Sequence, residues 1–149
     1  MTDSIGASPK ALQRAQVMTA LRAASSKTGV DFDYLVKTAQ RESNFDPSAK
    51  ASTSSATGLF QFTSETWLNM VERYGAKHGV KAEGLTREQL LDLRKDASLS
   101  ATMAGELAGE NGKILAKKLG REATSAELYA AHFMGPSDAA RLITAARNN

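Results

Sequence analysis

Apolar residues recur along this chain at helical spacings, three or four positions apart, and seldom alternate with polar ones. The first such segment covers about residues 9–28, where Ser8 followed by proline starts a helix and Gly29 ends it. Its imperfect apolar stripe consists of Leu12, Ala15, Val17, Ala20 and Leu21. This pattern is typical of a helix that packs one side against a core.

A second helical segment follows at once and ends in a polar loop. Asp31 is suited to cap its first turn, and Pro47 stops helical structure beyond Asp46. Residues 48–57 are nearly all Ser, Thr, Ala or Lys, which is the composition of a surface loop. Three positions of the helix share one face because they stand at i, i+4 and i+7: Leu35, Ala39 and Glu42.

The same period predicts five more helices after this loop. They cover residues 63–78, a short stretch from Thr86, residues 96–119 and residues 124–134, and a last helix begins at Ser137 or Asp138. Thr86 with Gln89, and Thr124 with Glu127, have the spacing of capping boxes. Three glycines in the long helix cost about 1 kcal/mol each relative to alanine. We expect them to let another helix approach closely: Gly105, Gly109 and Gly112.

These elements predict an all-α fold in one domain. We expect residues 8–149 to form the domain, residues 1–7 to form a flexible tail, and residues 48–60 to hold at most a very small β-hairpin. The length of 149 residues suits a single core, and the three prolines and few aromatics fit a helical protein. We expect a monomer.

Composition narrows the function by exclusion. The 19 basic residues are interspersed with 16 acidic ones, so no basic stripe marks a nucleic-acid-binding helical bundle. No apolar run reaches the length of about 18 residues that a membrane span needs. Without cysteine and with only two distant histidines, the chain shows no metal-ligand cluster, and we expect no cofactor. The first residues lack the pattern of a signal peptide.

The segment Arg41–Gln61 carries the strongest motif. It contains Glu42-Ser43, an Asn-Phe-Asp-Pro-Ser-Ala linker, and then Gly58-Leu-Phe-Gln61. In this order and spacing it resembles the soluble lytic transglycosylase and goose-type lysozyme family, over roughly residues 30–146. The resemblance implies a lysozyme-like domain in which the glutamate cleaves the glycan backbone of peptidoglycan.

Elementary chemistry supports Glu42 as a general acid. Cleaving a glycosidic bond requires a proton for the leaving oxygen, which a carboxyl group delivers only if it stays protonated near neutral pH. Glu42 continues an apolar stripe and lies at a helix C-terminus, and both features disfavour the charged form. Asp46 is the only nearby candidate for a second catalytic carboxylate, and it equally suits a turn.

The family resemblance implies supporting roles beside the acid. Ser43 matches a serine that orients the glutamate and contacts substrate. Gly58 permits a positive φ or a close backbone approach. Gln61 offers an amide for sugar hydroxyl and acetamido groups. Phe60 and Phe62 flank this glutamine. Either one packs inward and the other lines the groove, or both pack in the core.

A third family element, Ala-Tyr-Asn-x-Gly, is altered to Ala131-His-Phe-Met-Gly135. His132 stands in the tyrosine position, and Tyr129 lies one helical turn earlier on the same side. We expect both side chains to face the cleft near Glu42. A neutral imidazole would donate one hydrogen bond, as a tyrosine hydroxyl does. Activity should then fall towards acidic pH as the imidazole titrates from about 6.5.

The resemblance favours a lytic transglycosylase that acts on the bond between N-acetylmuramic acid and N-acetylglucosamine and forms a 1,6-anhydro end. Glu42 would be its single acid and base. A muramidase is the alternative within the same chemistry, and a catalytically inactive glycan-binding module is another. Peptidoglycan lies outside the cytoplasm, so we expect a periplasmic or wall-facing protein. It would reach the cell wall through a leader peptide trimmed from this sequence, through a secretion or flagellar apparatus, or by delivery from a phage.

Overall fold

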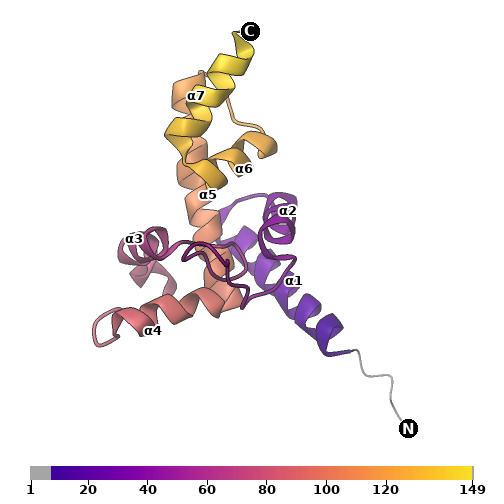
Figure 1. The fold of residues 1–149 in the computed structure, drawn as a ribbon, viewed down its shortest axis with the longest axis vertical. Coiled ribbons are helices and arrows are strands. Elements are labelled where there is room, and N and C mark those ends of the chain that lie inside the picture. The colour runs from indigo at the N-terminus through magenta and orange to yellow at the C-terminus, as the bar shows by residue number, and fades with distance from the viewer. Residues whose placement is uncertain (1–7, 149) are drawn as a thin grey trace.

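The fold is described here from a computed structural model, which covers residues 8–148 (Figure 1). The predicted all-α class is confirmed. The part of the chain that the structure describes forms the α-helices α1 (Pro9–Thr28), α2 (Phe32–Ser43), α3 (Ser64–Tyr74), α4 (Arg87–Asp92), α5 (Ala97–Leu119), α6 (Ser125–Met134) and α7 (Pro136–Arg147). It also holds the short 3₁₀ helices η1 (Ala76–His78) and η2 (Leu93–Lys95). The predicted tail, residues 1–7, lies outside the described residues.

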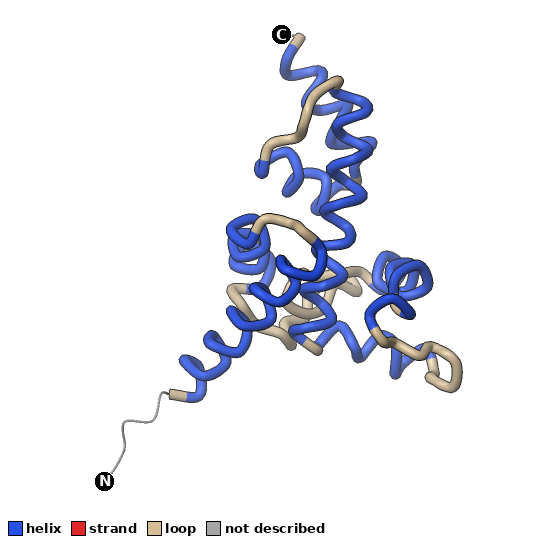
Figure 2. Tube along the Cα trace, turned by 180° about the vertical axis from the view of Figure 1, so that it is seen from behind, coloured by secondary structure: helices blue, strands red, loops and turns tan. Residues whose placement is uncertain are grey.

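The long helix α5 organises the molecule. One half of it packs against α1, α2 and α3, and the other half packs against α6 and α7 (Figures 1 and 2). Each half has its own apolar cluster. The larger cluster includes Leu35, Phe60, Trp67 and Met103, and the smaller one consists of Leu115, Leu119, Ala131, Ala139 and Ala140. The chain is therefore divided along α5 into a larger and a smaller packed region.

The helix boundaries follow from local capping chemistry. The Asp31 side chain accepts from the backbone N–H of Tyr34, and both predicted capping boxes are present at α4 and α6. One predicted start was wrong. The last helix begins at Pro136 and not at Ser137 or Asp138, because proline fits the first helical position, where its missing N–H has no partner to lose.

Two other helix expectations need correction. The stripe predicted on α1 is buried only from Val17 onward, whereas Leu12 and Ala15 are exposed, because the N-terminal half of α1 projects from the body (Figure 1). Of the three glycines in α5, only Gly105 admits a close neighbour. A Cβ there would lie 2.4 Å from the Thr28 hydroxyl of α1, while one on Gly109 would meet nothing within 4 Å.

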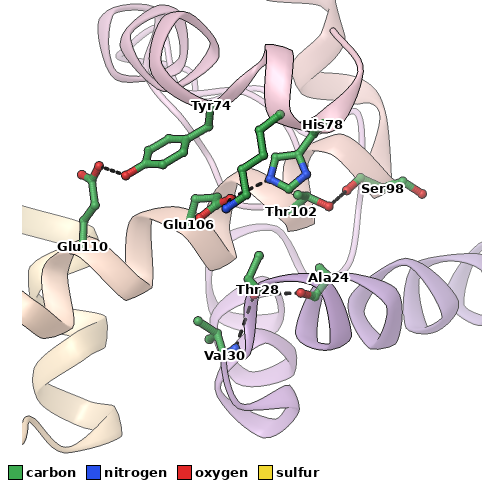
Figure 3. A network of polar contacts seen from close by, with 10 residues as sticks. Ala24, Thr28, Val30, Tyr74, His78, Ser98, Thr102, Glu106 and Glu110 are labelled. Atoms are coloured by element: carbon green, nitrogen blue, oxygen red, sulfur yellow. Dashed lines mark hydrogen bonds and ion pairs between the residues drawn. The ribbon is translucent and has the colours of Figure 1, made fainter.

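The helix predicted over residues 63–78 is shorter and ends at Tyr74. The chain then turns through η1, and side chains of this region bond to α5 (Figure 3). The Tyr74 hydroxyl donates to Glu110, and the His78 Nε2 lies 2.6 Å from the Glu106 carboxylate. Partial burial opposes the charged form of both carboxyl groups, but hydrogen bonds with Lys77 and His78 lower the pKa of Glu106, and those with Arg73 and Tyr74 lower the pKa of Glu110. His78 is thus a largely buried side chain that bonds to α5.

The β-hairpin anticipated within residues 48–60 is reduced to isolated pairings. Antiparallel bridges join Lys50 to Thr57 and Thr57 to Phe62. In the described part of the chain, no helix is long and apolar enough to cross a membrane. Across residues 8–148, no cluster of three or more His, Cys, Asp or Glu residues could hold a metal ion.

Candidate active site

The end of α2 is built so that the following loop folds back beside Glu42. Asn44 and Phe45 both take positive φ angles, of 51° and 65°, which turn the chain sharply. The Ser43 hydroxyl donates to the Leu59 carbonyl at 2.8 Å and accepts from the Asp46 N–H. This serine therefore ties the motif loop to the helix that carries Glu42, and no hydrogen bond joins it to Glu42 in the described structure.

The Gly58–Gln61 segment is held by close backbone approach. Gly58 has a φ of +90°, and a Cβ on it would lie 2.2 Å from the carbonyl oxygen of Arg94. Only glycine fits such a position. The Gln61 amide nitrogen donates to the carbonyls of Ala49 and Gly58, at 3.1 and 2.9 Å. These bonds fix the side chain of Gln61, a residue that also lines the cavity described below.

Arg94, which the sequence analysis did not single out, holds the loop by hydrogen bonds. Its guanidinium donates to the carbonyls of Ser55 and Phe62 at 2.6 and 3.0 Å, and to that of Leu91 at 3.0 Å. The residue is buried, and burial lowers the pKa of its guanidinium. With no carboxylate among its hydrogen-bond partners, Arg94 acts as a set of donors for loop carbonyls that would otherwise be buried without partners.

A cavity of about 560 Å³ opens between this loop, α2, α5 and α6. Its walls consist of Glu42, Ser54, Ala56, Gln61, Phe62, Thr63, Thr66, Leu107, Asn111, Ala131, His132, Phe133, Met134, Gly135 and Pro136. Glu42 is the one carboxylate in this set of described residues. Its Oε2 is buried and has no hydrogen-bond partner, which is a costly state for a carboxyl oxygen unless a ligand group meets it.

His132 reaches the cavity from α6. Its Nε2 lies 3.0 Å from the Phe60 carbonyl oxygen. Since a carbonyl only accepts, Nε2 carries the proton and donates it, and in the neutral ring Nδ1 is left as an acceptor. Burial lowers the pKa of His132, while the Phe60 carbonyl and the nearby charge of Glu42 oppose that shift. The rings of Phe60 and Phe62 meet the imidazole edge-on.

Two tyrosines that do not line the cavity lie close enough to Glu42 for its charge to affect them. Burial, with a smaller contribution from the charge of Glu42, raises the pKa of Tyr34 to about 12. The same two causes, together with a side-chain hydrogen bond with Glu42, raise the pKa of Tyr129. The Tyr34 hydroxyl donates to the Leu128 carbonyl at 3.4 Å, and the Arg41 guanidinium lies 4.9 Å from the centre of the Tyr129 ring. These contacts join α2 to α6 and so hold Glu42, on α2, near His132, on α6.

The structure separates the sequence-predicted site residues into two groups. Glu42, Gln61 and His132 line one cavity. The others do not line it and lie behind it or beside it: Ser43, Gly58, Phe60 and Tyr129. Phe60 and Phe62 both belong to the buried core, at 0% and 3% exposed, and Phe62 also forms part of the cavity wall.

Among the lining residues that the sequence analysis did not predict as site residues, two stand out by their exposure. Asn111 on α5 is 2% exposed and Phe133 on α6 is 72% exposed. A sequence signal existed for the first, because Asn111 follows Leu107 by one turn and so interrupts an apolar face of α5 with an amide. Phe133 carried a weaker signal, since it stands where the resembled motif has a polar asparagine.

An all-α domain with one glutamate in a cleft between a helix end and a polar loop defines the lysozyme-like class of structure. Residues 19–141 match the family model described as the transglycosylase SLT domain, and the chain belongs to this family. The match begins within α1 and ends within α7, so it includes the whole cavity. At the level of the family, this domain implies a lytic transglycosylase type of activity on peptidoglycan.

Proposed function

We propose that the protein is a lytic transglycosylase with Glu42 as its single general acid and base. It would cleave the β-1,4 bond between N-acetylmuramic acid and N-acetylglucosamine and leave a 1,6-anhydro-N-acetylmuramic acid end. The observation that carries this proposal is the lone carboxylate of Glu42 in the cavity, with its buried Oε2 unpartnered. Membership of the transglycosylase SLT domain family supports the same chemistry.

In the first step, protonated Glu42 donates its proton to the glycosidic oxygen while the bond from the anomeric carbon to that oxygen breaks. The departing N-acetylglucosamine leaves with the proton as its 4-hydroxyl group. In the second step, the 6-hydroxyl of the muramic acid attacks the anomeric carbon, and the Glu42 carboxylate accepts its proton. The enzyme regains its initial protonation state, and no water is consumed.

Hydrolysis by a muramidase is the competing chemistry, and it normally employs a second carboxylate. Asp46 is the nearest candidate in sequence. Its Oδ1 accepts from both the N–H and the hydroxyl of Ser48, at 2.9 and 3.0 Å, and it does not line the cavity. Asp46 therefore serves a turn, which supports the transglycosylase over the muramidase.

The direct test replaces Glu42→Gln, which keeps the shape of the side chain but has no proton to deliver. We expect clearing of cell-wall suspensions to fall by about 10²–10⁴-fold, because one group serves both steps. Asp46→Asn is the matched control and should retain activity. An active Glu42→Gln variant with an unchanged unfolding transition would refute the catalytic assignment.

The product distinguishes the two chemistries. Mass spectra of the released muropeptides should show ends lighter by one water molecule, as the anhydro form requires. Spectra dominated by reducing ends, together with loss of activity in Asp46→Asn, would make the protein a muramidase. Binding to cell walls without any release would instead indicate a glycan-binding module.

The proposed substrate sets the place of action. Peptidoglycan strands lie outside the cytoplasm, so we expect the protein to work in the periplasm or at the cell wall. Fractionation of cells or of culture medium, followed by detection of the native protein, checks this expectation.

A further inference from the structure

Asn111 is a buried residue whose side-chain amide has no hydrogen-bond partner among the described residues. It lies on α5 in the wall of the cavity and is 2% exposed. Its amide atoms are not among the fully enclosed unpartnered atoms, so they open into the cavity. A carboxamide offers two N–H donors and one carbonyl acceptor. Buried polar groups in folded proteins nearly always have partners, so an amide left free at a cavity wall points to a ligand.

Packing alone does not explain an amide at this position. Leu107, one turn earlier on α5, lines the same cavity, and Ala108 beside it is buried. An apolar residue at position 111 would continue this wall without leaving polar atoms unpaired. The amide therefore interrupts an apolar surface on the same cavity as the unpartnered Oε2 of Glu42.

Phe133 supplies a second, independent observation on the same cavity. It is 72% exposed, the most exposed of the large apolar side chains among the described residues, and it lies in the cavity lining. Contact of an apolar ring with water is unfavourable, and a ligand that covers the ring removes this contact. The face of a pyranose ring carries C–H groups, and it is a flat apolar surface that matches such a ring.

We infer that Asn111 and Phe133 form a subsite that selects 2-acetamido sugars. The acetamido group carries one N–H donor and one carbonyl acceptor, which pair with the carbonyl and N–H of the Asn111 carboxamide. Its methyl group packs on Leu107, and the sugar ring stacks on Phe133. This inference deepens the proposed function and rests on it for the glycan, but it concerns recognition and not the chemical step.

The inference predicts a preference for acetylated glycan. Cell walls would be compared before and after chemical removal of the N-acetyl groups, with a re-acetylated sample as control. A site built to hydrogen-bond a group rejects the analogue that lacks it, because its own polar atoms are then left unpaired. We expect the wild type to favour acetylated walls by at least about tenfold in kcat/KM, which is a modest share of what such sites achieve.

Substitutions assign the preference to its residues. Asn111→Leu should lose most of the preference, with the change mainly in KM, and Asn111→Asp, which retains only acceptors, should lose part of it. Phe133→Ala should raise KM for both walls alike. Asn69→Leu is the matched control, because Asn69 is exposed on α3 outside the cavity. A full acetyl preference in Asn111→Leu would overturn the inference.

Direct binding separates this inference from the proposed function. Titration calorimetry would measure binding of a tetramer of N-acetylglucosamine and of the glucosamine tetramer to Glu42→Gln protein. We expect selective binding of the acetylated tetramer, and loss of that selectivity once Asn111→Leu is added. Selective binding with no wall cleavage by the wild type would refute the function and leave the subsite standing. Equal binding of both tetramers, or of neither, would refute the subsite.

Discussion

At the scale of single residues, the site combines a carboxyl oxygen without a partner and an imidazole with a fixed one. The Oε2 of Glu42 is buried and unpaired, whereas the Nε2–H of His132 is held by the Phe60 carbonyl. Since that bond fixes the neutral tautomer, only the far nitrogen of the ring is open to protonation. The nearby charge of Glu42 opposes the lowering of the His132 pKa that burial causes.

The first prediction at this scale concerns pH. Because burial lowers the pKa of His132, the acidic loss of activity should begin below the value of about 6.5 that the isolated side chain implies. This corrects the expectation from sequence. Protonation then favours ionised Glu42, which has no proton to donate. A pH profile of His132→Tyr should be flatter on its acidic side, and an unchanged profile would contradict the proposal.

The same shift has a consequence for stability. A histidine whose pKa is lowered in the folded state binds fewer protons there than in the unfolded chain. The free energy of unfolding should therefore decline as pH falls from about 6.5 towards the lowered pKa, and less so in His132→Tyr. Urea unfolding at pH 7 and pH 5 measures this, above the range in which paired carboxylates titrate.

A second residue-scale prediction concerns Gly58. Replacement by alanine forces a side chain into a φ of +90° and places Cβ 2.2 Å from the Arg94 carbonyl oxygen. Gly79→Ala is a matched control, since Gly79 has a φ of +84° but nothing within 4 Å of its Cβ. The control should cost about 1–2 kcal/mol for the strained backbone. Gly58→Ala should cost clearly more and also reduce wall clearing; equal costs would mean that the contact with Arg94 is unimportant.

At the scale of elements, the stability of α6 matters for the site, because α6 carries His132 and Phe133. Its capping box pairs Thr124 with Glu127, and Arg121 forks onto the same carboxylate with two bonds of 2.8 Å. The Arg121 bonds, with help from the backbone of Thr124, lower the pKa of Glu127 to about 2. The charged form of Glu127 therefore stabilises the start of α6.

This arrangement predicts the effect of Glu127→Gln. A depressed pKa contributes stability that is present above the unfolded value of about 4.3 and is lost as pH falls towards 2. At pH 7 we expect a loss of about 1 kcal/mol, because Arg121 is partly exposed and water screens the pair. Urea unfolding should show this gap narrowing below pH 4. Glu122→Gln, a change at an exposed neighbour, should leave the free energy of unfolding equal to that of the wild type. A difference for Glu127→Gln that stays constant with pH would exclude the ion pair as its cause.

What the sequence could predict at this scale depends on how local the cause is. Both capping boxes and the glycine stops lie within a few residues of the helices that they bound, so the pattern identified them. Arg94 escaped notice because it donates to carbonyls 39 and 32 residues away in the sequence, and nothing near it indicates them. Asn111 lies in a helix whose cavity-facing side is defined only by packing against the loop and α6.

The site itself shows the same limit. The motif spacing found Glu42 and Gln61, and the altered third motif found His132, since family patterns carry long-range geometry within short segments. The patterns did not distinguish residues that line the cavity from those behind it. Ser43 shows this difference, because it was expected beside the acid and substrate, yet it bonds the Leu59 carbonyl.

At the scale of the whole molecule, the cavity lies where the two packed regions of the chain meet. The first region supplies Glu42, Gln61 and Phe62, and α6 of the second supplies His132 and Phe133. The second region has the smaller core, made mainly of alanine and leucine around α5, α6 and α7. A smaller buried apolar area gives less stability, so α6 and α7 should open more readily than the rest.

Hydrogen exchange resolved along the chain tests this prediction. Amides of α6 and α7 should exchange through an opening whose free energy is below that of global unfolding, which governs α1. Leu115→Ala should lower the opening free energy of α6 and α7 by about 2–5 kcal/mol, because Leu115 is fully buried in their core. Leu21→Ala, equally buried in the first core, should lower protection in α1 and leave that of α6 and α7 unchanged. Equal loss in both regions from Leu21→Ala would mean that the molecule opens only as one cooperative unit.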